Sequence, residues 1–383
     1  MATKKKRILM LNYEFPPLGG GGGVAAKKLA EGFIKKGYIV DYLTTGFKGL
    51  KKFEKVNGIN VHRIKVIGRK ELPTATMPSL LSFPVMAYKK GKELCEKNNY
   101  EFIVSQFAVP TGPLGVMLSK KYNLKHILSL QGGDIYDPTK KSSPHNKWYL
   151  RNAVRSILNN STIVVVHSSN TRNNAIKYYN YLGEIKIILV PYTPIKFKRV
   201  SRKKMGLETS NIYLIGIGRI VKRKGFDFLI RTLAKLNNKK VHVLIIGDGP
   251  EKENLINLSK ELGVRNKVHF LGFVSEEKKF QYLSNSDIFI LSSVHEGFGI
   301  VVQEAMQVGL PIIATDNGGQ VDFVKNNENG YLVKFGDEKA MKNAIEKLNK
   351  SEALRDKISK NNKKKIKEFS LGKIIKTYLE VLK

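Results

Sequence analysis

The sequence lacks three features that would each indicate a special environment. A single cysteine, Cys95, cannot form an intramolecular disulfide, so we expect a reducing, cytoplasmic compartment. The apolar run Ile8–Leu11, which follows a basic N-terminal segment, is too short for the core of a secretory signal. No stretch approaches the roughly 18 apolar residues that a bilayer-spanning helix needs. Any association with the inner face of the cell membrane would therefore be peripheral.

Acidic residues and metal-ligand patterns are scarce as well. The chain has 67 Lys and Arg against 32 Asp and Glu, a formal net charge of +35, which favours anionic partners. A Lys-rich proteome bias spread over solvated faces would give the same balance. No helix-turn-helix, zinc or aromatic stacking signature accompanies the charge, so nucleic acid is not an expected partner. The sequence has no Asp-x-Asp and no His/Cys cluster with metal-ligand spacing, so we predict neither a metal nor another cofactor.

Short apolar runs alternate with amphipathic helical segments along all 383 residues, as in parallel sheets with helical crossovers. A chain of this length exceeds the usual size of one compact core. The expected strands of the first half are Ile8–Leu11, Ile39–Thr44, Asn60–Val66, Phe102–Ser105, His126–Leu130, Ile163–His167 and Ile187–Val190. Those of the second half are Tyr213–Ile217, His242–Ile246, Val268–Leu271, Ile288–Leu291, Pro311–Ala314 and Gly330–Val333. Two such sets predict two doubly wound α/β domains.

The boundary between the domains is expected near residues 191–194, where two prolines interrupt the pattern. We therefore predict an N-terminal domain over residues 1–193 and a C-terminal domain over residues 194–369. Apolar residues at helical spacing from Leu371 to Leu382 indicate a last helix with one buried face. In two-domain folds of this kind that helix, residues 370–383, crosses back onto the N-terminal domain, although the sequence alone leaves open which domain receives it.

The strongest local signal is a pair of carboxylates, Glu296 and Glu304, which lie eight positions apart after an apolar strand. Glu296 falls in the strand-to-helix loop, and Glu304 falls two turns into the following helix. Ligands bind at the carboxyl ends of strands in open α/β sheets, which is where this loop is expected. The backbone N–H groups of Gly297, Phe298 and Gly299 would point at an anion there. An ordinary turn with Glu304 on a solvated helix face is the alternative.

A second constellation follows the first strand of the second half. Gly218 releases the chain at the strand end, and we expect Arg219 and Lys224 to project from the loop. Arginine offers a planar fork of donors and lysine a point charge, and both suit an anionic ligand. Lys222 and Arg223 are expected to be solvated, although either could share the role if the loop register differs.

A third candidate site is the run of five glycines at positions 19–23, which follows the segment Tyr13–Pro17 and precedes a helix. Polyglycine at a strand-to-helix junction presents several N–H groups to an anion, so Gly20 and Gly21 are predicted to bind phosphate. A merely flexible linker is the alternative.

Together these motifs resemble the retaining glycosyltransferases of family 4, which have the GT-B architecture of two Rossmann-like domains facing a central cleft. The segment from Glu296 to Glu304 resembles their E-x7-E signature, and Gly318-Gly319 resembles the turn that follows it. The segment Gly216–Gly225 resembles their Gly-Arg…Lys-Gly motif. The segment Pro16–Gly23 resembles their Pro-Pro…Gly-Gly loop. The resemblance extends over nearly the whole chain.

The resemblance implies a nucleotide diphosphate sugar, such as a UDP- or GDP-sugar, as donor. Glu296 would contact the donor sugar and Glu304 the ribose hydroxyls, since a carboxylate can accept hydrogen bonds from two vicinal hydroxyls. Arg219 and Lys224 would bind the pyrophosphate in place of a divalent cation. The C-terminal domain is thereby implied to bind the donor and the N-terminal domain the acceptor.

The remaining implied contacts involve the nucleotide base and the acceptor. The base would lie against the backbone near Gly272 and Phe273. Many relatives carry His where this chain has Gln131, and Gln cannot act as a general base. With retained configuration the leaving phosphate oxygen can take the acceptor proton, so Gln131 and Asp134 would only orient the acceptor hydroxyl and the sugar. Asp134 as an N-cap or turn residue is the alternative.

The predicted function is therefore retaining transfer of a hexose to a saccharide or lipid-linked acceptor in cell-surface glycan or glycolipid synthesis. Basic and apolar residues interleave between His62 and Lys92. This suits a peripheral anionic membrane surface that presents such an acceptor, or equally a solvated helix with one buried face. A non-catalytic relative that binds sugar nucleotides and, less favoured, a basic nucleic-acid-binding protein are the alternative functions.

Overall fold

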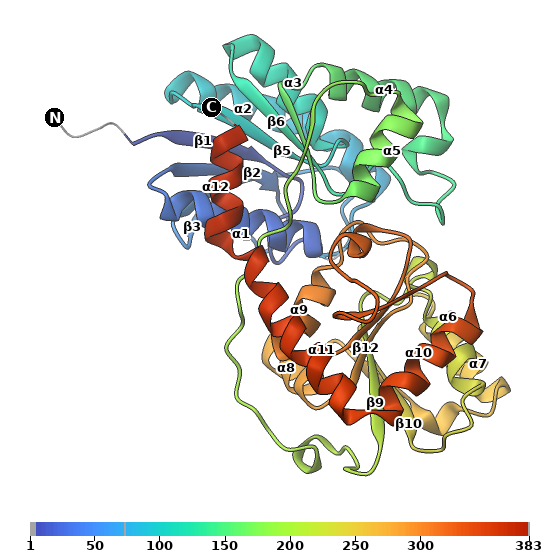
Figure 1. Ribbon diagram of the computed structural model, residues 1–383. Coiled ribbons are helices and arrows are strands. Elements are labelled where there is room, and N and C mark those ends of the chain that lie inside the picture. Colours follow the sequence, from blue (N-terminus) through green and yellow to red (C-terminus); the bar gives the residue numbers. More distant parts are fainter. Residues whose placement is uncertain (1–4, 73, 382–383) are drawn as a thin grey trace. The chain divides into compact units, whose positions relative to one another are not determined.

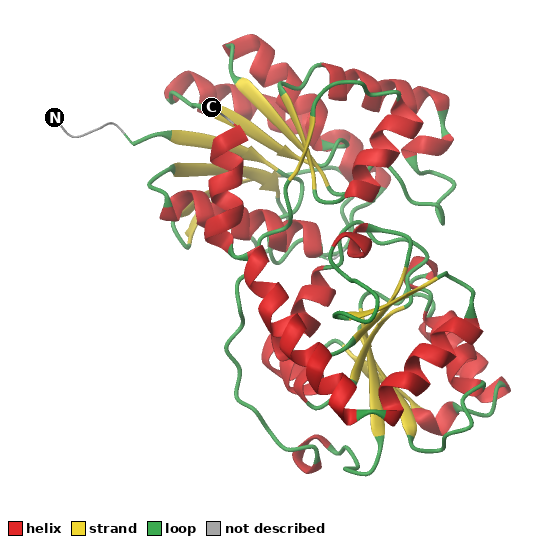
Figure 2. Cartoon of the chain, viewed as in Figure 1, coloured by secondary structure: helices red, strands yellow, loops and turns green. Residues whose placement is uncertain are grey.

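The computed structural model describes residues 5–72 and 74–381 of the chain. The chain divides into two compact units, Met1–Thr193 with Phe369–Lys383, and Pro194–Glu368. In each unit helices flank a largely parallel sheet (Figure 2). The predicted fold class, two Rossmann-like α/β domains, is therefore confirmed. Residues 382 and 383, which belong to the predicted last helix, lie outside the described residues.

Within its described residues, the first unit has an eight-stranded sheet in the order β3-β4-β2-β1-β5-β6-β7-β8. Its strands are β1 Arg7–Leu11, β2 Ile39–Thr45, β3 Phe53–Val56, β4 Ile59–Ile64, β5 Phe102–Gln106, β6 Lys125–Leu130, β7 Ile163–Val166 and β8 Ile185–Ile187. Its α-helices are α1 Gly21–Lys35, α2 Met77–Lys97, α3 Thr111–Tyr122, α4 Trp148–Asn159, α5 Ser169–Tyr179 and α12 Leu371–Val381. Helices α1 and α12 pack on one face, and α2 to α5 pack on the other.

The last helix belongs to the first unit because its apolar stripe completes the core beside α1 (Figure 1). Ile374, Ile375 and Tyr378 are buried there. A Cβ atom on Gly32 of α1 would lie 2.5 Å from the Ile375 side chain, so glycine at this position lets the two helices approach closely. The helix thus replaces solvent over one face of the sheet.

Two details of the first sheet differ from the sequence prediction. The short strand β3 pairs antiparallel with β4 as an edge hairpin, and its mostly exposed residues gave no apolar signal. The predicted bounds of the strand Ile187–Val190 are wrong, because β8 pairs with β7 over Ile185–Ile187. Ile188 and Val190 are buried beyond the strand end. Ile188 N still donates to the carbonyl of Val166 in β7 at 2.9 Å, so pairing extends one residue past the strand, and the apolar side chains pack in the core.

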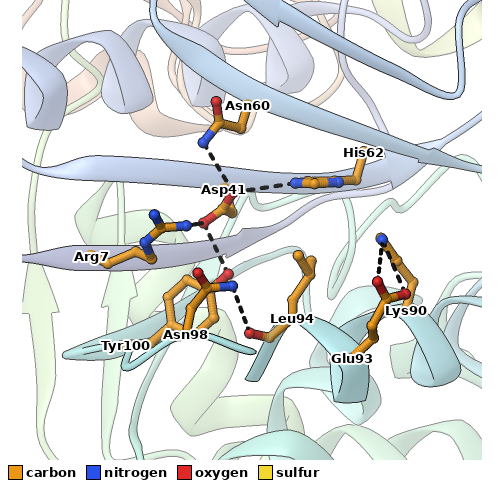
Figure 3. Close-up of polar contacts among 9 residues, drawn as sticks. All are labelled: Arg7, Asp41, Asn60, His62, Lys90, Glu93, Leu94, Asn98 and Tyr100. Atoms are coloured by element: carbon orange, nitrogen blue, oxygen red, sulfur yellow. Dashed lines mark hydrogen bonds and ion pairs between the residues drawn. The ribbon is translucent and has the colours of Figure 1, made fainter. Parts of the chain in front are cut away.

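A buried carboxylate, Asp41 of β2, connects three strands of this sheet (Figure 3). It accepts hydrogen bonds from Arg7 of β1 at 2.8 Å, from Asn60 of β4 at 3.1 Å and from Tyr100 at 2.9 Å, and it lies 3.2 Å from Nε2 of His62. Burial alone would raise the pKa of Asp41, but these partners together hold the pKa below its usual value. The hydrogen bonds of Asp41 hold these strands together at some distance from the edge at which the strands end.

Within its described residues, the second unit has a six-stranded parallel sheet in the order β11-β10-β9-β12-β13-β14. The strands are β9 Ile212–Ile217, β10 Val241–Ile246, β11 Val268–Gly272, β12 Ile288–Leu291, β13 Ile312–Thr315 and β14 Gly330–Val333. The α-helices are α6 Phe226–Ala234, α7 Lys252–Glu261, α8 Glu276–Ser284, α9 Ile300–Val308, α10 Glu338–Lys350 and α11 Glu352–Lys365. Because all strands are parallel, their carboxyl ends and the loops that follow them share one edge.

Across residues 5–72 and 74–381, no helix has the length and apolar character needed to cross a membrane.

Candidate active site

The centre of the candidate site is an ion pair at the carboxyl edge of the second sheet. Lys224 follows β9 and Glu296 follows β12, so the strand order places the two loops next to each other. The Lys224 Nζ atom lies 2.5 Å from Oε2 of Glu296, and the two side chains are only 12% and 14% exposed. Lys224 and Glu296, which are 72 positions apart in the chain, thus form an ion pair. Its ammonium group can bind an anion, and its carboxylate can bind a hydroxyl.

The carboxyl of Glu296 is held in its ionised form. Burial alone would raise the pKa of Glu296, but Lys224 and Arg223 lower the pKa to about 2. Near neutral pH the carboxylate is therefore a pure hydrogen-bond acceptor, which is the form needed to bind sugar hydroxyls.

The backbone of Glu296 is held by the Gly318-Gly319 turn after β13. Glu296 N donates to the carbonyl of Asn317 at 3.2 Å, and Gly319 N donates to the carbonyl of Glu296 at 2.9 Å. A Cβ atom on Gly318 would lie 2.2 Å from the Glu296 carbonyl oxygen, so only glycine fits there. The glycine pair of the sequence motif therefore positions the carboxylate.

Arg223 also supports this loop, against the expectation that it would be solvated. Its Nη1 atom donates to the carbonyl of His295 at 2.9 Å, and its own carbonyl accepts from Val294 N at 2.8 Å. The sequence could not show this, because Lys222, Arg223 and Lys224 look alike as a run of basic residues. Lys222 of the same run is exposed, as predicted.

Three glycines at the ends of neighbouring strands bring the backbone close together beside the ion pair. Gly218 N donates to Ile246 O, and Gly247 N donates to Gly272 O. A Cβ atom on Gly247 would lie 2.0 Å from Gly218 O. Gly218 in turn lies beside the Lys224 side chain, since its own Cβ would be 2.9 Å from the Lys224 Cε atom. The edge is therefore flat and free of side chains at these three positions, which allows a ligand to approach the backbone.

Two predicted residues of this edge are solvent-exposed. Arg219 follows Gly218 directly and its side chain is exposed. Phe273, which follows Gly272, is 77% exposed. Because Arg219 and Phe273 directly follow glycines at the strand ends, both can still reach a ligand there. Neither side chain is held in one position by packing.

The N-terminus of α9 carries the rest of the E-x7-E segment. Gly297, Phe298 and Gly299 are buried directly before the helix, and Gly299 adopts a φ of +95° that favours glycine. The predicted strand-to-helix turn is therefore present. Their proximity to Glu296 places a helix N-terminus, with its partial positive charge, at the same edge as the ion pair.

Glu304 lies in the second turn of α9 and pairs with a lysine that the sequence reading did not single out. Lys279 of α8 has its Nζ atom 2.7 Å from Oε1 of Glu304 and 2.7 Å from Oε1 of Glu276. The Lys279 and Glu304 side chains are each 12% exposed. Glu304 is therefore not on a solvated face. Lys279 stands in a run of charged residues, and nothing in that run distinguishes it from a surface lysine.

In the first unit, the carboxylate of Glu14 lies at the segment that was predicted to bind a phosphate. Gly21, Gly22 and Gly23 form the first turn of α1 and are not a loop. The Glu14 carboxylate accepts hydrogen bonds from Gly20 N and Gly23 N, each at 3.1 Å. A carboxylate thus occupies the helix N-terminus that was expected to face a phosphate. In this structure the backbone N–H groups of Gly20 and Gly23 converge on the Glu14 carboxylate, and phosphate binding by Gly20 and Gly21 stays a prediction.

Gln131 belongs to a polar network at the carboxyl ends of β5, β6 and β7. Its Nε2 atom lies 2.7 Å from Oε1 of Gln106 and 3.0 Å from Nε2 of His167. The Nδ1 atom of His167 lies 2.8 Å from the carbonyl of Ile188, so Nδ1 carries the hydrogen and Nε2 accepts. Burial lowers the pKa of His167 to about 4, which agrees with this neutral form. The Nε2 atom of Gln131 also lies 3.1 Å from Oγ of Ser129, so its amide nitrogen faces this buried network.

Asp134 has the geometry of the turn residue that was the alternative for it. Its Oδ1 atom accepts from Gln131 N at 3.0 Å, and its Oδ2 atom accepts from Ala108 N at 2.6 Å. Burial raises the pKa of Asp134 to about 6, although these N–H groups act in the opposite direction. Asp134 therefore ties the loop after β6 to the loop after β5, and so it holds Gln131 in place.

Comparisons with known proteins agree with this geometry. The model of the family "Glycosyltransferase Family 4" matches residues 19–191, and the model "Glycosyl transferases group 1" matches residues 197–365. An uncharacterized glycosyltransferase of Methanocaldococcus jannaschii is 27% identical over 98% of both chains. Among solved structures, sucrose-phosphate synthase from Thermosynechococcus elongatus superposes with a TM-score of 0.86 at 21% identity over 98% of both chains. Anabaena HepE in complex with UDP and glucose gives 0.79 at 21% identity, over 98% of this chain and 99% of that one.

These likenesses define the chain as a GT-B glycosyltransferase. It belongs to the glycosyltransferases of the family 4 type, as the sequence resemblance predicted, and each of its two units matches one of the two family models.

Proposed function

We propose that this glycosyltransferase moves a hexose from a nucleotide diphosphate sugar to a saccharide or lipid-linked hydroxyl, with retained configuration and without a metal ion. The proposal rests on one observation above all, the Lys224–Glu296 pair at the glycine-lined edge of the second sheet. A lysine beside a leaving diphosphate neutralises developing charge, and a carboxylate beside it grips the sugar that stays behind. Arg219 adds a second cation at the pyrophosphate.

The reaction breaks the bond between the anomeric carbon and the phosphate oxygen and forms a bond from the same carbon to the acceptor oxygen. The acceptor proton passes to the leaving phosphate oxygen, so no protein base is required. In the first unit the Gln131 oxygen accepts a hydrogen bond from a sugar or acceptor hydroxyl, and Asp134 and His167 hold Gln131 in position. A glutamine carries out this task without titrating, whereas a histidine at this position would change charge near neutral pH.

The donor is tested first by binding. A panel of UDP-, GDP-, ADP- and TDP-sugars is added to the protein, and the melting temperature is recorded. A bound donor stabilises the native state by mass action, so one nucleotide class should raise the midpoint while the others leave it unchanged. UDP-glucose is the first compound to test, because the similar HepE structure was solved with it. A panel without any shift would contradict the donor class.

Turnover, stereochemistry and metal dependence are tested with the donor that binds. Release of the nucleoside diphosphate is measured with and without EDTA, and the anomeric configuration of the product is read by NMR. We expect unchanged turnover in EDTA and a retained anomer. Binding without any turnover would support the non-catalytic alternative, and abolition by EDTA would contradict charge neutralisation by Lys224 and Arg219.

Lys279 is expected to act on the nucleoside through Glu304. Replacing Lys279 by methionine leaves the buried Glu304 carboxylate without this cation, and we expect the affinity for the nucleoside diphosphate to fall about tenfold. If Glu304 binds the ribose hydroxyls, the 2′,3′-dideoxy nucleotide should bind weakly to the wild-type protein and lose little more in the variant. Isothermal titration calorimetry of both nucleotides on both proteins measures the coupling.

Lys235→Met is the matched control, because Lys235 of the same unit pairs with Glu338 while its side chain is 64% exposed. It should leave both affinities unchanged. Equal losses for the two nucleotides in Lys279→Met would show that Lys279 supports the pocket in general and does not act through the ribose hydroxyls.

A further inference from the structure

Helix α2 of the first unit is apolar on two sides, and only one of them is covered. Phe83, Ala87 and Leu94 are buried against α3 and the sheet. On the exposed side Met77, Leu81 and Val85 follow each other at four-residue spacing, with Met86 beside Val85. Their exposed fractions are 58%, 69%, 73% and 45%. We call these four residues the α2 stripe. Exposed apolar side chains that adjoin on one helix face are a typical contact surface, so the stripe points to an occupant.

The charge around the α2 stripe is mostly positive. Lys89 continues the stripe by a further four-residue step and is exposed, and Lys65 and Lys70 are exposed on the segment that leads into the helix. Glu71 is the only acidic residue between His62 and Lys92. An apolar ridge bordered by lysines is complementary to the acyl and headgroup layers of an anionic bilayer.

The α2 stripe begins at the functional edge of the first sheet. Helix α2 follows β4, which is parallel to β2, so its first turn lies where the parallel strands end (Figure 1). The carbonyl of Leu72, just before the helix, accepts hydrogen bonds from Gly19 N at 3.0 Å and from Arg69 at 2.9 Å. Leu72 and Ile67 in this leading segment are exposed as well. The stripe is thereby tied to the glycine segment before α1.

We infer that the α2 stripe and its flanking lysines dock on an anionic lipid bilayer and hold the first unit against the membrane surface. The apolar side chains enter the boundary between headgroups and acyl chains, and the lysines contact the lipid phosphates. This inference rests on the proposed function in one respect: docking at this edge would bring a lipid-linked acceptor to Gln131 along the surface, without leaving the bilayer. The sequence alone left a solvated helix with one buried face as an equal alternative, and the exposed second apolar side supports the membrane interpretation.

The test is co-sedimentation of the full chain with vesicles of phosphatidylcholine alone and of equal parts phosphatidylcholine and phosphatidylglycerol. The wild-type protein should bind the mixed vesicles, and less so as the salt concentration rises. Leu81→Asp with Val85→Asp should lower the partition coefficient by about tenfold or more. Lys70→Glu with Lys89→Glu should lower it by a similar factor and weaken the salt dependence. All four side chains are exposed, so the variants should keep the wild-type melting temperature.

Matched controls come from the opposite edge of the same sheet. Leu182, which is 92% exposed, precedes β8, and Lys120 and Lys121 lie at the end of α3. Leu182→Asp and the double variant Lys120→Glu, Lys121→Glu should bind vesicles as the wild-type protein does. As a direct probe, Val85→Trp in a Trp148→Phe background should shift its emission to shorter wavelength on mixed vesicles.

Three outcomes would overturn the inference: no binding of the wild-type protein to mixed vesicles, equal losses in the controls, or a change in oligomeric state of the stripe variants in the absence of lipid. The last would identify a second copy of the chain as the occupant. Failure of the proposed function is separable, because nucleotide binding and donor turnover in solution do not involve the stripe. Vesicle binding without turnover would leave the docking surface standing, and turnover on a soluble acceptor without vesicle binding would leave the enzyme standing.

Discussion

Replacing Lys224 by methionine is expected to lower the turnover of sugar transfer by about a hundred- to a thousandfold, because in the proposed reaction it removes the fixed charge at the departing diphosphate. The same change leaves the Glu296 carboxylate without the cation 2.5 Å away, in a position where both side chains are largely buried. We therefore also expect the free energy of unfolding to fall by about 3 kcal/mol. Steady-state kinetics and urea unfolding of the same preparation measure the two effects.

The pair of Lys235 and Glu338, in which the lysine side chain is 64% exposed, provides the comparison for this variant too. Lys235→Met removes a lysine from an ion pair in the same unit, but exposed pairs contribute at most about 1 kcal/mol, so activity and stability should change little. Lys224→Arg, which keeps the charge, should retain more activity than Lys224→Met. Near wild-type turnover in Lys224→Met would mean that the diphosphate is neutralised elsewhere.

The acid side of the stability profile offers a second readout for Lys224. In the folded protein Lys224 and Arg223 hold the pKa of Glu296 at about 2, below the ordinary value of 4.5. The ionised carboxylate therefore stabilises the fold above about pH 4.5, and this contribution is lost as the pH falls from 4.5 toward 2. In Lys224→Met that contribution should shrink, so the variant should lose less stability than the wild-type protein over this interval.

Replacing Gly318 by alanine is the second change with a large expected effect, although Gly318 is not itself proposed to contact the substrate. The new Cβ would lie 2.2 Å from the carbonyl oxygen and 2.8 Å from the nitrogen of Glu296, and the backbone there has a φ of +147°. The Glu296 backbone must therefore move. We expect a loss of about 2 to 4 kcal/mol in the free energy of unfolding and at least a tenfold loss of turnover, because the carboxylate proposed to hold the sugar is displaced from its position.

Gly336→Ala separates backbone strain from displacement of Glu296. Gly336 has a φ of +87°, but among the described residues no atom lies within 4 Å of the position its Cβ would take. Strain alone should cost about 1 kcal/mol, with turnover unchanged. If Gly318→Ala were no more harmful than Gly336→Ala, the turn after β13 would not be what positions Glu296.

The sequence predicted the elements that carry a strong periodic or spacing signal. The helix Ile300–Val308 follows the loop that holds Glu296, and Glu304 lies in its second turn, as the motif predicted. Short buried strands were found because parallel sheets make continuous apolar runs. The hairpin strand β3 was missed, since its exposed residues form no such run, and β8 was placed two residues too late because core packing beyond the strand is apolar too.

The partners of the site residues were beyond the reach of the sequence. Nothing in the chain indicates that Glu304 meets Lys279, that Arg223 holds the His295 carbonyl or that Glu14 fills the N-terminus of α1. Each of these contacts joins residues whose proximity depends on the packing of whole elements. Family motifs predicted which residues form the site, but only the fold shows which neighbour fixes each of them.

Helix α12 has a consequence for how the chain is made. It is synthesised after the whole second unit, yet its side chains complete the core of the first unit beside Phe33 and Gly32 of α1. At ordinary ribosomal speeds the apolar face of α1 therefore waits, uncovered, on the order of ten seconds or more after its own unit has emerged. We expect chaperones to bind the nascent first unit during that interval, and a ribosome that stalls within the second unit would leave the face of α1 uncovered.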